Sequence, residues 1–146
     1  LANDHFKVWV EERINKLGIE LSVGDAYVKI AQSDLVIVAS GTATLEIALL
    51  GVPMVVVYKL SGVSYQIVKR LLRTNFISLP NVILGKEVVP ELIQENANGK
   101  NIASVAMQII VSDNSKLVSE LKKIHSQLHQ ESSAQSAKAI LKLVNE

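Results

Sequence analysis

The sequence predicts an α/β protein with a Rossmann-like, mostly parallel sheet, followed by helices toward the C-terminus. Two runs rich in β-branched residues, at 34–39 and 53–58, lack polar alternation, which is typical of strands covered on both faces. Helical patterns separate these runs, and this alternation indicates βα units with helices on both sides of the sheet. Beyond the sheet region only helical patterns remain, so we expect a Rossmann-like part at 1–100 and a helical segment at 101–146.

The first part is expected to begin with an amphipathic helix at 5–17. Phe6, Val10 and Ile14 fall on one face of such a helix, and charged residues fall on the other. Gly18 suits its C-terminal end. The next elements are a short strand at 20–23 and a short helix that opens at Gly24 and Asp25 and ends near Gln32.

The segments around the second buried strand continue the alternation. Residues 43–50 have helical propensity, and Gly51 suits the residue that closes a helix. Pro90 suits the first turn of a helix, because its missing N–H would have no acceptor there. The elements expected after the second strand are a helix at 61–73, a strand at 76–79, a turn at Pro80–Asn81 and a helix at 90–94.

The C-terminal third predicts three helices, at 101–110, 115–129 and 132–144. Four apolar residues of the second helix are spaced four, three and four apart, which makes a seam like that of a coiled coil. The seam consists of Leu117, Leu121, Ile124 and Leu128. It needs an apolar partner, either within the chain or in a second subunit.

The composition excludes several classes of function. Fifteen basic and fourteen acidic residues leave a net charge of +1, and aromatic residues make up 4%, so we expect no nucleic-acid partner. The absence of cysteine excludes a disulfide scaffold and a thiolate metal site. His125 and His129 are four apart, but no third ligand stands at a supporting spacing, so we expect no metal site. The apolar runs are far shorter than the ~20 residues that a membrane-spanning helix needs.

The strongest local sign of a binding site is the junction between the first buried strand and the next helix, at 35–46. Ser40, Gly41 and Thr42 form a small loop there. The first N–H groups of a helix lack intrahelical acceptors and carry partial positive charge, which suits a phosphate. Ligands of open α/β sheets bind at the carboxyl ends of strands, where this loop lies. The alternative is that Ser40 or Thr42 only caps the helix.

Glu46 also allows two interpretations. A capping box needs an acid three residues after the N-cap, and Glu46 is four residues after Thr42, so it fits that role poorly. Its carboxylate is either an acid favoured near a helix N-terminus or an acceptor for the two hydroxyls of a ribose. The spacing alone does not decide between them.

From these residues onward the sequence resembles a known family. The motifs are A-S-G-T-A-T-L-E-I-A-L-L-G-V-P-M-V-V-V-Y-K at 39–59, S-L-P-N at 78–81 and G-K-E-V-V-P-E-L-I-Q at 85–94. Together they closely resemble lipid-A-disaccharide synthases, which are GT-B glycosyltransferases. The resemblance covers nearly the whole chain. It implies the later part of the C-terminal, UDP-sugar-binding domain, so residues 1–100 would be a partial Rossmann-like domain.

The resemblance implies an inverting, metal-independent transferase without a cofactor. Such an enzyme moves a diacylated glucosamine from UDP to a monosaccharide lipid phosphate and so forms the lipid A disaccharide. The resemblance further implies a cytoplasmic location with peripheral contact at the inner membrane, and a homodimer that exchanges C-terminal helices. The catalytic base and the acceptor site would lie in a missing N-terminal part of the enzyme, so this chain alone would be inactive.

The resemblance also implies roles for individual residues. The residues implied to bind the UDP-sugar are Ser40, Gly41, Thr42 and Ala43 at the diphosphate, Glu46 at the ribose, and Gly24 and Asp25 at the uracil. Asn81 matches a position that the family needs for activity, although a Pro-Asn turn would also explain an asparagine there. Lys86 and Glu87 form either a surface ion pair or a charged contact near the donor.

Two other functions stay open. The chain could be another UDP-sugar transferase of the GT-B class, although the S-L-P-N and G-K-E-V-V segments argue against it. It could also be a non-catalytic nucleotide-binding or dimerisation module. A basic edge, formed by Lys59, Lys69, Arg70 and Arg73, is either a contact for anionic lipid head groups or a solvated surface.

The usual strand order of a complete domain of this kind is 3-2-1-4-5-6. On that order, residues 20–23 would be strand three and residues 34–39 strand four. Strands one and two, which normally lie between them, would be absent. We therefore expect residues 1–31 to be poorly folded in the isolated chain, unless these residues repack or another polypeptide supplies the two strands.

Overall fold

The structure is a computed structural model, and it describes residues 6–14, 17–62, 65, 75–128 and 132–144. Its sheet has three parallel strands in the order β1-β2-β3, formed by Val36–Ala39, Met54–Tyr58 and Glu91–Ile93. Val36 pairs with Met54, and Val56 pairs with Glu91. The carboxyl ends of all three strands therefore lie at one edge of the sheet. The predicted α/β class with a parallel sheet is confirmed.

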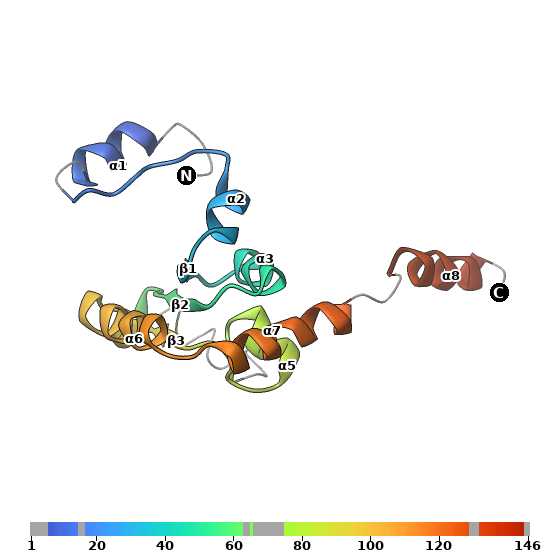
Figure 1. Cartoon of the computed structure of the whole chain (residues 1–146). Helices are drawn as coiled ribbons and strands as arrows, with labels where there is room; N and C mark the ends of the chain where they lie inside the picture. The colour runs from blue at the N-terminus through green and yellow to red at the C-terminus, as the bar shows by residue number, and fades with distance from the viewer. Residues whose placement is uncertain (1–5, 15–16, 63–64, 66–74, 129–131, 145–146) are drawn as a thin grey trace.

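Helices lie on both sides of this sheet (Figure 1). On one side, α3 (Thr42–Leu50) packs on β1 and β2, while α5 (Leu79–Leu84) and α7 (Ser115–Leu128) pack on α3. On the other side, α6 (Gly99–Val111) packs on β2. The remaining elements are α1 (Lys7–Ile14), α2 (Ala26–Ala31), the 3-10 helix η2 (Gln94–Asn96) and α8 (Ser132–Val144). None of the helices that the structure describes is both long enough and apolar enough to cross a membrane.

The main apolar core lies between the sheet, α3 and α7. Ile47 of α3, Met54 of β2 and Leu121 of α7 are among its fully or almost fully buried side chains. Alternate residues of a strand face opposite sides of a sheet, so Val55 points away from Met54 and toward the side that α6 covers. Val55 is also fully buried. The continuous apolar pattern of β2 therefore reflects burial on both faces.

The apolar seam of α7 finds its partner within the chain. Leu121 and Ile124 are fully buried in the main core, and Leu117 packs against it. Leu128, at the end of the seam, is 45% exposed. The part of the seam that needed an apolar partner is thus satisfied by α3 and α5 of the same chain.

Two elements predicted around residue 80 are wrong. The expected strand at 76–79 and turn at Pro80–Asn81 are replaced by α5, for which Ser78 is the residue before the first helical position. Proline is tolerated in the first turn of a helix, because the N–H that it lacks has no intrahelical acceptor there. The pattern Leu-Pro-Asn therefore begins a helix here instead of forming a turn.

The helix predicted at 90–94 is also wrong, because Pro90 leads into β3. Its carbonyl accepts a hydrogen bond from Val56 N at 2.9 Å, which begins the pairing with β2. Proline cannot donate to a ladder, but at the start of a strand its carbonyl can still accept. Three residues are too few for a sequence pattern to distinguish a strand from a helical turn.

The N-terminal segment departs most from expectation. Residues 20–23 form no strand, and none of the residues in α1 is buried. Phe6, placed on the apolar face of the predicted helix, is 57% exposed. Among the described strands, β1 pairs only with β2, which makes it an edge strand. The helix predicted at 61–73 lies largely outside the described residues.

Replacing Leu121 with alanine should lower the free energy of unfolding by about 2–5 kcal/mol, because it leaves a cavity in the core. Leu128→Ala is the matched control, since Leu128 lies on the same helix and is 45% exposed. Urea denaturation followed by circular dichroism measures both. Equal losses in the two variants would contradict the assignment of Leu121 to the core.

Candidate functional site

The loop between β1 and α3 has the geometry of a helix N-terminus without a side-chain cap. Gly41 occupies the N-cap position with φ 155° and ψ −166°, and no side chain caps the helix. Thr44 closes the first turn, because both its N–H and its hydroxyl donate to Gly41 O, at 3.1 and 2.7 Å. The alternative that Ser40 or Thr42 caps the helix is therefore wrong. The N–H groups of Thr42 and Ala43 belong to the turn that lacks intrahelical acceptors.

Ser40 is held from two sides. Its N–H donates to Val57 O at 3.1 Å, which extends the β1–β2 ladder by one residue. Its hydroxyl donates to Ile77 O at 2.8 Å, in the segment before α5. The start of the loop is thus bonded to β2 and to Ile77, the residue before the S-L-P-N motif.

Asn81, predicted as catalytic, is fully buried in α5. Its Nδ2 donates to Val89 O and to Glu91 Oε1, both at 2.8 Å. Its Oδ1 accepts from Val88 N at 2.7 Å and from Val89 N at 3.0 Å. An asparagine amide offers two donors and two acceptor positions, so all four are used within the protein. Contact of Asn81 with a substrate stays a prediction, and this geometry favours an indirect role.

Glu91, which the sequence analysis missed, is the centre of the same cluster. Its Oε1 accepts from Ser78 N at 3.0 Å, from Ser78 Oγ at 2.6 Å and from Asn81 Nδ2. Its Oε2 accepts from Ile77 N at 2.9 Å. The only hint in the sequence is one carboxylate within the apolar run 88–93. A half-buried charge in a strand needs partners of this kind.

Gln94 forms a second tie at the carboxyl edge of the sheet. Its side chain accepts from Leu60 N at 2.7 Å and donates to Leu60 O at 3.1 Å. This pair holds the chain where it leaves β2. A cavity of about 350 Å³ lies beside it, lined by Ala39 at the end of β1, by Lys59 after β2 and by Ile102 of α6. The edge that carries the β1–α3 loop is therefore indented.

Glu46, predicted to contact the ribose, lies exposed on α3 about one turn after its start. Its neighbours Ile47 and Ala48 are buried in the core. The helix therefore holds the carboxylate on its solvent side, near the loop.

Gly24 and Asp25 lie just before α2, which packs on α3. Asp25 is the N-cap residue of α2, and a hydrogen bond from Ser22 holds the pKa of its carboxyl below the ordinary value. Their predicted contact with uracil stays a prediction.

Lys86 and Glu87 lie away from the β1–α3 loop. They come before the amino end of β3, whereas the loop follows the carboxyl end of β1. Lys86 Nζ pairs with Glu120 Oε2 of α7 at 2.8 Å. Hydrogen bonds from Lys123 and Lys86 hold the pKa of Glu120 below its ordinary value. The structure therefore does not bring Lys86 and Glu87 together with the other predicted binding residues.

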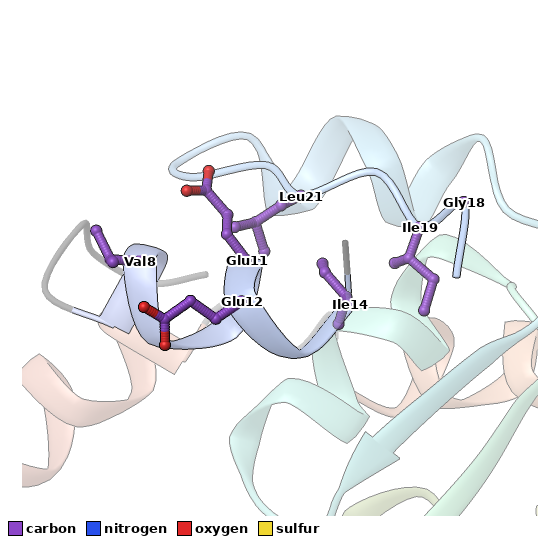
Figure 2. Close-up of a pocket in the computed structure, with 7 residues that line it drawn as sticks. All are labelled: Val8, Glu11, Glu12, Ile14, Gly18, Ile19 and Leu21. Atoms are coloured by element: carbon purple, nitrogen blue, oxygen red, sulfur yellow. The ribbon is translucent and has the colours of Figure 1, made fainter. Parts of the chain in front are cut away.

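A cavity of about 510 Å³ lies near the N-terminus, between α1 and the segment after it (Figure 2). Figure 2 shows Glu11 and Glu12 of α1 at its wall, together with Ile19 and Leu21. It includes none of the predicted site residues. Among the described residues no group of three or more His, Asp or Glu side chains could hold a metal ion.

A comparison with protein families matches residues 3–144 to the family described as lipid-A-disaccharide synthetase. The chain belongs to this family. A family match over nearly the whole chain includes the β1–α3 loop, α5 and β3.

Curated relatives carry the name lipid-A-disaccharide synthase. The chain is 43% identical over 128 residues to the protein of Pseudomonas paraeruginosa, and the aligned region covers 88% of this chain and 34% of the relative. It is 38% identical over 135 residues to that of Idiomarina loihiensis, covering 92% and 36%. It is 38% identical over 147 residues to that of Pseudomonas putida GB-1, covering 99% and 39%. The chain therefore spans little more than a third of the length of these relatives.

Replacing Asn81 with alanine should destabilise the fold by about 2–4 kcal/mol, because it leaves the half-buried N–H of Val88 and the buried N–H of Val89 without acceptors and removes one donor to Glu91. This differs from the small effect that a turn asparagine would have. Asn101→Ala is the matched control, since the Asn101 amide donates one exposed hydrogen bond of 3.3 Å. Thermal melts of both variants test this. An unchanged melting temperature for Asn81→Ala would refute the four-bond arrangement.

Proposed function

We propose that this chain is the UDP-sugar-binding part of a lipid-A-disaccharide synthase, an inverting glycosyltransferase. The donor is a UDP-linked diacylated glucosamine, and the acceptor is a monosaccharide lipid phosphate. Membership of the lipid-A-disaccharide synthetase family carries the proposal. The β1–α3 loop supports it, because an uncapped helix N-terminus at the carboxyl edge of a parallel sheet suits a diphosphate.

The loop offers a way to stabilise the leaving group. As the bond to the sugar breaks, negative charge grows on the β-phosphate of UDP, and donors aimed at that position stabilise the transition state. The N–H groups of Thr42 and Ala43 are such donors in this proposal. The side chain of Gly41 is a single hydrogen, and a Cβ added there would meet nothing within 4 Å. The loop surface is therefore open to a bulky ligand.

The reaction needs groups beyond this chain. The chain spans 34–39% of the relatives named above, so the acceptor site and the catalytic base are proposed to lie in the remaining part of such an enzyme. We place the complete protein in the cytoplasm, in peripheral contact with the membrane that holds its lipid substrates. Assay of the complete protein with a UDP-linked lipid donor tests the activity. The 146-residue chain alone should give no product.

The proposal assigns the ribose hydroxyls to Glu46. Replacing Glu46 with alanine in the complete protein should raise the Kd for UDP about tenfold, because charge-assisted hydrogen bonds to the ribose are lost. The fold should be unaffected, since Glu46 is exposed. Titration calorimetry beside a thermal melt measures both. Glu12→Ala, another exposed glutamate on a helix, is the control, and an unchanged Kd in Glu46→Ala would remove Glu46 from the site.

The C-terminal helix α8 is proposed to pack on a second subunit in a homodimer. Four of its apolar side chains, Ile140, Leu141, Leu143 and Val144, are 61–75% exposed. Figure 1 shows α8 beyond the end of α7, apart from the sheet. We expect the complete protein to be a dimer in light scattering. We expect the variant Leu141→Glu and Leu143→Glu to shift it toward the monomer, and a monomeric unaltered protein would contradict this assembly.

A further inference from the structure

We propose that Glu91 is a positioning residue for the nucleotide site and acts through Ser40. The inference rests on the proposed function and specifies what Ser40 does within it. Glu91 lies in β3, two strands away from the loop after β1, and the segment 77–78 connects them. The hydrogen bonds among the carboxylate, this segment and Ser40 form one continuous chain.

The carboxylate of Glu91 divides its contacts between its two oxygens. Oε1 accepts from the N–H and the hydroxyl of Ser78 and from Asn81. Oε2 accepts from Ile77 N. An ionised acceptor makes stronger hydrogen bonds than a neutral one, so the three bonds from Ile77 and Ser78 hold the segment 77–78 firmly against β3.

The peptide unit between Ile77 and Ser78 transmits this position to Ser40. A trans peptide is planar, and its N–H and C=O point in opposite directions. The N–H of Ser78 donates to Glu91 Oε1 at 3.0 Å, and the carbonyl of Ile77 accepts from Ser40 Oγ at 2.8 Å. The carboxylate and the hydroxyl therefore lie at opposite edges of one rigid, planar peptide unit. Hydrogen bonds in such a chain also polarise one another, which strengthens the Ile77 carbonyl as an acceptor.

Asn81 supports the carboxylate from the other side. It donates to Glu91 Oε1 and is itself anchored to the backbone of Val88 and Val89. Both Asn81 and Ser78 are fully buried, so no other partner replaces these bonds at low cost. All four hydrogen-bonding positions of the Asn81 amide are used within the protein, so none is left for a ligand. The S-L-P-N motif is instead connected to the β1–α3 loop by the hydrogen bonds of Ser78 and Asn81 to Glu91 and of Ser40 to Ile77.

This arrangement determines what Ser40 can offer to a diphosphate. A hydroxyl has one proton, and that of Ser40 is given to Ile77 O. The Ser40 oxygen then has only lone pairs left, and lone pairs cannot donate a hydrogen bond to an anionic phosphate oxygen. Ser40 therefore fixes the direction in which the loop leaves β1, while the backbone N–H groups of Thr42 and Ala43 donate to the ligand.

The test is a double-mutant cycle on UDP affinity in the complete protein. Glu91→Gln keeps the shape of the side chain, but its NH₂ group must face either Ile77 N–H or the donors of Ser78 and Asn81. Ser40→Ala removes the other end of the connection. We expect each single variant to raise the Kd for UDP about five- to tenfold, and the double variant to bind about as weakly as either single one. Ser40→Thr keeps the hydroxyl and should restore near-normal affinity.

Asp113→Asn is the matched control. Asp113 also accepts from a backbone N–H and a serine hydroxyl, those of Ser115 at 2.9 and 3.0 Å, but it lies two residues before α7. It should leave the Kd for UDP unchanged. Thermal melts of all variants separate loss of affinity from loss of fold. If Glu91→Gln does not fold, an unaltered Kd for UDP in Ser40→Ala would still overturn the inference.

The outcomes separate this inference from the proposed function. Effects of Ser40→Ala and Glu91→Gln on the Kd that multiply independently would show that Ser40 affects binding without Glu91, and would overturn the inference. A Glu91→Gln protein with a lower melting temperature and unaltered UDP affinity would also overturn it. If the unaltered complete protein does not bind UDP, the proposed function itself fails, and the inference fails with it.

Discussion

The hydrogen bonds between Asn81, Glu91 and the backbone around them are the constraint on which the site region depends. They join α5 to the third strand and hold the segment before α5 against the sheet. Because Asn81 is fully buried, its four hydrogen bonds must all be made within the protein. Loss of one partner would leave several buried polar groups unpaired, so the cluster forms as a unit.

The apolar core and this polar cluster contribute different kinds of interaction to the fold. Burial of Ile47, Met54 and Leu121 holds α3 and α7 on the sheet, and this attraction has little directional preference. Hydrogen bonds are directional, so the polar cluster determines where residues 77–81 lie relative to the loop after β1. The apolar core thus holds the helices on the sheet, and the polar cluster fixes the position of the segment before α5.

The two edges of the sheet differ in what they hold. The carboxyl edge carries the β1–α3 loop, the tie between Gln94 and Leu60, and a cavity of about 350 Å³. The amino edge carries Lys86, which is paired with Glu120 of α7. This pair is partly exposed, and such pairs contribute little to stability. The β1–α3 loop and Lys86 therefore lie at opposite edges of the sheet.

The sequence by itself determined the long or strongly patterned elements. The β-branched runs predicted β1 and β2, and the helical periodicity predicted α6 and α7. Burial of one or both faces of an element requires apolar residues at regular spacings, which can be recognised in the sequence. Tertiary structure decided the short ones, because α5 and β3 have only six and three residues. Pairing of β3 with β2, and packing of α5 on α3 and α7, outweigh their local preferences. Tertiary structure also decided the role of Glu91, since its partners lie 10–14 residues away in the chain. A local sequence pattern cannot predict these hydrogen bonds, because only the folded backbone brings the donors within hydrogen-bond distance of the carboxylate.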